Sequence, residues 1–143
     1  MPRVALWFFA VAPIYVLIGM SLGIYMGASE DMSLFPAHAH INLIGWVTMA
    51  LYGTFYALAR DASRKLAWTT FWLNNIGIVV LFPSLVMVLK FGPLPAYLVP
   101  LVISEFLVFG GMLCFAASVW GVLLRSKESD TRMPSGLSAE PAE

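Results

Sequence analysis

The chain has 143 residues, of which 60% are hydrophobic and only 11% are charged, with a formal net charge of zero and a mean hydropathy of +0.84. A soluble domain of this size carries roughly 25% charged residues, so this composition excludes one and predicts an integral membrane protein whose surface faces the lipid bilayer. The balanced charge gives no indication of a nucleic-acid partner, and a single cysteine, Cys114, excludes an intrachain disulfide framework.

Four segments of the chain are long and apolar enough to cross a membrane, which takes about 20 mostly apolar residues. The predicted spans are 4–27, 40–59, 67–89 and 97–124. The short connections between them force consecutive helices to be antiparallel. We therefore predict an all-α, four-helix up-down bundle formed by one domain, residues 1–125. Residues 126–143 change to a Ser-, Glu-, Pro- and Gly-rich composition, which predicts a disordered cytoplasmic tail.

The cationic residues predict the orientation of the bundle. Seven of the eight Lys and Arg residues fall before the first span, between the second and third, or after the fourth, and only Lys90 falls on the other side. The positive-inside rule then places both termini in the cytoplasm, with a bacterial inner membrane as the expected setting. The start of the second span lies near the outer face.

Polar residues within the spans are few, and each needs a partner or a function because a buried ionisable group is expensive in lipid. Glu105 is the only carboxylate at depth, and it is either hydrogen-bonded or part of a functional site. Asn74 and Asn75 are expected to form hydrogen bonds between helices. Gly19 and Gly23 form a small-xxx-small pair that predicts a close-packing face on the first helix.

Two histidines, His38 and His40, stand where the second span begins. Residues two apart on a helix are rotated by about 200°, so if both are helical they face opposite sides and serve different sites. If the helix begins only at His40, the two rings could share a small metal ion. Neutral imidazole is a common ligand for haem iron, copper and zinc. The span is therefore a candidate metal or haem site, while purely interfacial histidines are the alternative.

The residues that follow the histidines suggest room for a planar cofactor. Gly45 and Gly53 fall on the same helical face as His38, together with the larger Met49 and Tyr52. The glycines would leave space for a macrocycle, and the aromatic residues would form the sides of its site. This pattern favours haem, with no residue set that predicts catalysis by side chains alone.

The stretch 38–58, HAHINLIGWVTMALYGTFYAL, resembles haem-copper oxidase subunit I and the short four-helix proteins described as cytochrome c oxidase subunit I-like. The resemblance rests on H-x-H followed by N-L-x-G-W at the outer end of a second span. It implies that the chain corresponds to one four-helix arc of subunit I, that each histidine ligates a different haem, and that the cofactor is haem b. The resulting set of cofactor-binding residues is His38, His40, Asn42, Gly45, Trp46, Met49, Tyr52 and Gly53, with both histidines as metal ligands.

The chain also departs from that family, because no histidine follows His40 and one protomer therefore lacks the ligands of an oxygen-reduction centre. A haem with two axial histidines would pair His38 of one protomer with His40 of the next, which predicts a homo-oligomer, with a closed trimer preferred over a dimer. The expected function is that of a b-type cytochrome-like protein, either transferring electrons to a redox partner or binding a diatomic gas. The alternatives are a copper or zinc module that uses both histidines and Met32, and a non-catalytic membrane assembly subunit.

Overall fold

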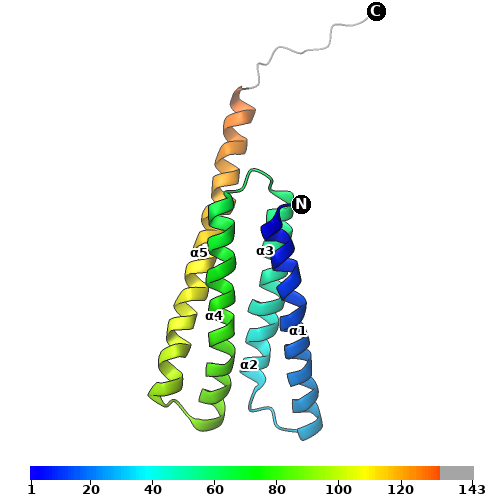
Figure 1. The fold of residues 1–143 in the computed structure, drawn as a ribbon, viewed down its shortest axis with the longest axis vertical. Coiled ribbons are helices and arrows are strands. Elements are labelled where there is room, and N and C mark those ends of the chain that lie inside the picture. Colours follow the sequence, from blue (N-terminus) through cyan, green and yellow to red (C-terminus); the bar gives the residue numbers. More distant parts are fainter. Residues whose placement is uncertain (133–143) are drawn as a thin grey trace, which may run out of the picture.

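The computed structural model describes residues 1–132, with side chains as far as Lys127, and every regular element within that range is a helix (Figure 1). The helices are α1 (Arg3–Ser29), α2 (Phe35–His40), the π-helix η1 (Ile41–Thr48), α3 (Met49–Leu58), α4 (Arg64–Phe91) and α5 (Pro95–Arg132). The segments α2, η1 and α3 follow one another without a break and form a single rod. The all-α prediction is confirmed.

Four helical segments are long and apolar enough to cross a membrane, as predicted. They are Arg3–Ser29, Phe35–Leu58, Arg64–Phe91 and Pro95–Lys127. They form two antiparallel hairpins, in which α1 pairs with α2, η1 and α3, and α4 pairs with α5 (Figure 1). The second span begins five residues earlier than predicted, because Pro36 occupies the first turn of α2, where its missing N–H is not needed.

The predicted disordered tail is wrong for residues 126–132, which continue α5 beyond the end of the bundle (Figure 1). A helix that already exists grows by one hydrogen bond per added residue and bears no new nucleation cost. Arg125 at the start of this extension also donates a hydrogen bond from Nη2 to the backbone oxygen of Asp61 at 2.8 Å. The rest of the predicted tail, residues 133–143, lies outside the described residues.

The π-helical segment decides which residues of the second span share a face. Its backbone bonds run from i to i+5, so each turn holds more residues than an α-turn, and Thr48 Oγ1 correspondingly donates to the oxygen of Leu43, five residues back, at 2.8 Å. In an α-helix, residues four positions apart rotate progressively about the helix axis. In this π-helical segment they remain on nearly the same side of the axis. His40, Ile44 and Thr48 therefore line the same side of the rod.

The two hairpins are joined by aromatic and hydroxyl contacts in the half of the bundle that holds the chain's N-terminus. The Tyr56 hydroxyl donates to Ser118 Oγ at 2.9 Å and lies 3.3 Å from Thr70 Oγ1. The Tyr15 hydroxyl donates to Asn75 Oδ1 at 2.8 Å, which confirms the interhelical hydrogen bond expected for Asn75. These bonds link α1 and α3 to α4 and α5.

Replacing Tyr56 with phenylalanine is expected to lower the free energy of unfolding in detergent by about 0.6–1.7 kcal/mol, the range of interhelical hydrogen bonds in membranes. The hydroxyl is buried and bridges α3 to α5. Tyr25→Phe is the matched control, because the Tyr25 side chain is half exposed. Denaturant titration followed by circular dichroism measures both, and equal losses in the two variants would contradict a role for the Tyr56 bridge.

Candidate functional site

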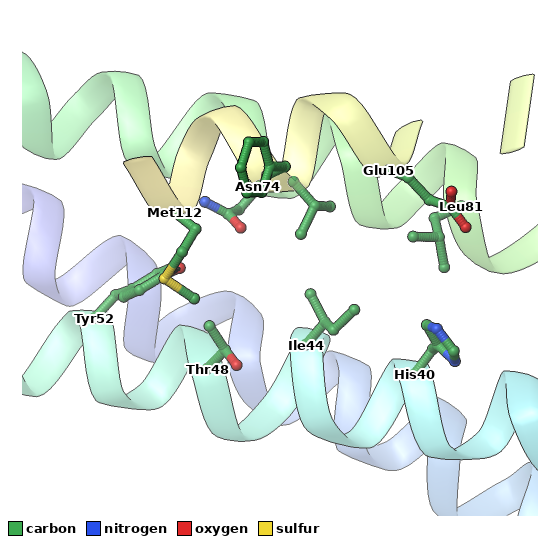
Figure 2. A pocket seen from close by; sticks show the side chains of 10 residues that line it. His40, Ile44, Thr48, Tyr52, Asn74, Leu81, Glu105 and Met112 are labelled. Atoms are coloured by element: carbon green, nitrogen blue, oxygen red, sulfur yellow. Dashed lines mark hydrogen bonds between the residues drawn. The ribbon is translucent and has the colours of Figure 1, made fainter. Parts of the chain in front are cut away.

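A cavity of about 410 Å³ lies between the second span and the α4–α5 hairpin (Figure 2). We call it the His40 cavity. The second span contributes four residues at four-residue intervals, which the π-helical segment keeps aligned. The lining residues are His40, Ile44, Thr48 and Tyr52 from the second span, Asn74 and Leu81 from α4, and Glu105, Val108, Phe109 and Met112 from α5.

His40 presents one free ring nitrogen at this cavity. Its Nδ1 lies 2.8 Å from the backbone oxygen of Pro36, and because a carbonyl oxygen only accepts, Nδ1 carries the proton that is donated. In the neutral ring Nε2 is then the atom with the lone pair. Metal-ligating histidines commonly use the same arrangement, in which a backbone carbonyl fixes the tautomer and the orientation of the ring.

Asn74 contributes an unpaired acceptor to the wall of the same cavity. The side chain is fully buried against Gly111 of α5, and its Nδ2 donates to the oxygen of Thr70 at 2.9 Å. The interhelical hydrogen bond expected for Asn74 is therefore not formed, and its Oδ1 has no partner among the described residues. An unpaired buried acceptor costs about 1–3 kcal/mol, so the cavity is suited to a ligand or water that donates a hydrogen bond there.

Glu105 faces the same cavity from α5, on the wall opposite His40 (Figure 2). The sequence singles out both residues as unusual within a span but does not predict that they meet. Two other polar groups of the lining are already engaged, since Thr48 bonds its own helix and the Tyr52 hydroxyl donates to Met112 Sδ at 3.4 Å. The polar atoms left to act on a ligand are therefore the Nε2 of His40, the Oδ1 of Asn74 and the carboxylate of Glu105.

His38 lies on the other side of the rod and is held against α1. Its Nδ1 donates to the backbone oxygen of Gly19 at 2.9 Å, and its ring covers Gly23 so closely that an added Cβ would lie 2.9 Å from it. The amide of Asn42 lies 3.4 Å from the ring nitrogens and donates to the backbone oxygen of His38 at 2.8 Å. Both histidines are helical and lie on different sides of the helix, which is the first of the two arrangements expected for them.

The copper or zinc arrangement that shares both histidines is not formed in this structure. His38 and His40 belong to the same helix, α2, and face different neighbours. Met32, the proposed soft ligand, is 62% exposed in the loop before α2. Among residues 1–127, whose side chains the structure describes, no group of three or more His, Cys, Asp or Glu side chains could hold a metal ion.

The two glycines of the predicted cofactor face, Gly45 and Gly53, pack against α1. An added Cβ on Gly45 would lie 2.8 Å from the Tyr15 side chain, and one on Gly53 would lie 3.1 Å from Phe8. These glycines therefore make room for α1, and the space expected for a macrocycle on this face is filled by its aromatic side chains. Met49 is fully buried and Trp46 is 37% exposed, and neither lines the His40 cavity.

Of the eight predicted cofactor-binding residues, His40 and Tyr52 line the cavity and the other six do not. The missed residues of the second span, Ile44 and Thr48, could have been found by reading every fourth position from His40. The missed residues of α4 and α5 carry no such signal, because their approach depends on how the hairpins pack.

Comparisons with known proteins do not add to this geometry. No protein-family model, no curated protein and no solved structure matches the chain. What the His40 cavity can bind must therefore follow from its own residues.

Proposed function

We propose that the protein is a membrane haem-binding protein of the b-type cytochrome kind, in which His40 would hold the iron. The observation that carries this proposal is the bond from His40 to the oxygen of Pro36, which leaves Nε2 without a hydrogen bond on a residue that lines an open cavity between the helices. Histidine is the commonest protein ligand of b-type and globin-type haem iron. The resemblance of residues 38–58 to oxidase subunit I supports the same assignment.

The residues around His40 fit such a group on one side of the iron. The cavity volume of about 410 Å³ falls in the range of roughly 300–1,000 Å³ usual for cofactor pockets. Ile44, Leu81 and Phe109 supply apolar walls, and the hydrogen-bonded His40 supplies the ligand. When bound, the haem would supply one-electron transfer or reversible binding of a diatomic gas.

Whether a second histidine would also hold the iron distinguishes electron transfer from binding of a diatomic gas. Within the described residues, His40 is the only histidine that lines the cavity, because His38 is tied to Gly19. Pairing His38 of one protomer with His40 of the next would break that bond. We therefore favour a haem that would be held by His40 alone and would supply gas binding, and we retain a homo-oligomer, trimer or dimer, as the arrangement that could supply a second histidine.

Glu105 gives the cavity a group that can hydrogen-bond to a ligand. Its carboxyl group lines the cavity that it shares with His40. This arrangement would stabilise a polar or partly charged gas ligand.

The proposal is tested by the absorption spectrum of detergent-purified protein, oxidised and reduced, together with iron and copper analysis. We expect a Soret band, iron stoichiometric with the chain, and a shift of the reduced band when carbon monoxide is added, since a single axial histidine leaves a vacant position. Protein from haem-replete cells that holds neither iron nor a Soret band would overturn the proposal. Copper in its place would favour the metal-module alternative, and a band that does not respond to carbon monoxide would indicate two axial ligands.

A further inference from the structure

A second hollow region lies along α1 and α4, on residues that do not line the His40 cavity. Two of its hollows, of about 410 and 360 Å³, are lined by residues of both helices and share Trp68, and a third of about 460 Å³ is lined by α1 alone and adjoins them through Arg3 and Trp7. We call it the α1–α4 groove. Its principal lining residues are Arg3, Trp7, Val11, Arg64, Trp68 and Phe71.

One end of the groove is strongly suited to an anion. Arg3 and Arg64 both line it, and within the described part of the chain neither guanidinium has a hydrogen bond or an ion pair. Arg3 and Arg64 are also the first residues of α1 and α4, so the positive ends of two helix dipoles point to the same end. α1 has no side-chain cap, whereas the Leu66 N–H in the first turn of α4 donates to Ser63 Oγ.

The rest of the groove is apolar and runs along the helices. Trp7, Val11, Trp68 and Phe71 line it, and Phe71 is 4% exposed. Val11 lies about 12 Å further along α1 than Arg3, at 1.5 Å per residue. The groove thus has two arginines at one end. The rest of its length is lined by aromatic and aliphatic side chains and lies at the depth of the lipid chains.

We propose that the α1–α4 groove binds one anionic glycerophospholipid, with its phosphate between Arg3 and Arg64 and an acyl chain along Trp68. A lipid is the ligand in a membrane that joins an anionic phosphate to a long apolar chain, and basic pockets between spans at the cytoplasmic side bind such headgroups. The positive-inside rule assigns this end of the bundle to the cytoplasm. The assignment is independent of whether the His40 cavity holds haem.

The charge requirement is tested with full-length protein in detergent, by native mass spectrometry during titration with phosphatidylglycerol or with phosphatidylcholine of the same acyl chains. We expect tighter binding of phosphatidylglycerol to the wild type, and a loss of about 25-fold in the double variant Arg3→Gln/Arg64→Gln, roughly fivefold for each arginine. Arg60→Gln/Lys65→Gln is the matched control, because it removes the same charge from residues that do not line the groove. Equal losses in the two double variants would overturn a specific site.

The acyl chain is tested by filling the groove while both arginines are kept. Val11→Trp is expected to weaken phosphatidylglycerol binding at least about fourfold, the contribution of one buried CH₂ group of the acyl chain, whereas Ile14→Trp, at an exposed position of α1, leaves it unchanged. Inorganic phosphate serves as the headgroup without a chain. Displacement of the lipid by millimolar phosphate, or unchanged binding in Val11→Trp, would show a simple anion site and overturn the proposal.

Discussion

Replacing His40 with alanine is expected to abolish the Soret band, whereas replacing His38 with alanine leaves the band in place. His40 lines the cavity with its Nε2 free of hydrogen bonds, and the His38 ring is held against Gly19 and Gly23 of α1. Loss of an outer-shell partner alone weakens metal binding roughly 10–100-fold, so loss of the ligand itself should exceed about 100-fold. Haem titration of the purified variants measures the difference.

Rescue by free imidazole separates loss of a ligand from loss of the fold. In His40→Gly the missing side chain leaves a space that imidazole can enter from the cavity, so the band should return as imidazole is added. In His38→Gly the space opens between α2 and α1, away from the cavity, and imidazole should not alter the spectrum. A folded His38→Ala protein that has lost its band would overturn the assignment of His40 as the sole ligand from this chain.

Replacing Gly23 with leucine is expected to lower the free energy of unfolding by about 1–3 kcal/mol or more, the cost of overpacking a filled core. Any Cβ at Gly23 meets the His38 ring at 2.9 Å, and the ring cannot yield without giving up its hydrogen bond to Gly19 at 2.9 Å. The variant should therefore separate α1 from α2. Denaturant unfolding in detergent, followed by circular dichroism, measures the loss.

Gly27→Leu is the matched control for this substitution. Gly27 lies one turn further along α1 and has no heavy atom within 4 Å of an added Cβ, so both changes raise helix propensity equally and only one meets a neighbour. We expect wild-type stability or a slight gain for Gly27→Leu. Equal stability of the two variants would show that the His38 ring does not pack on Gly23.

The sequence predicted the spans well because membrane insertion is governed by local apolar composition. Four runs of about 20 apolar residues suffice to identify four helices, and the structure extends each by a few residues, except at the end of the second span, which stops at Leu58. The tail prediction was wrong for residues 126–132 because composition measures the ability to bury surface, while an existing helix can continue without burying any.

The glycine pair on α1 predicts close packing but does not identify the side chains that pack there. Gly19 and Gly23 predict close packing, and close packing is what the structure has. The partners, however, are Asn42 and His38, which the sequence assigned to a cofactor. A glycine pattern indicates that something approaches the helix, but it carries no information about which side chain approaches.

By itself, the sequence determined the four helices, and it implied that His38 and His40 separate if both are helical, because the helical repeat is a local property of the backbone. Only the tertiary structure decided that His38 faces α1 and that His40 meets Glu105 and Asn74 in one cavity. That outcome depends on the rotation of each rod about its axis, which the π-helical turns of η1 alter. It depends equally on the packing of one hairpin against the other, which no single span encodes.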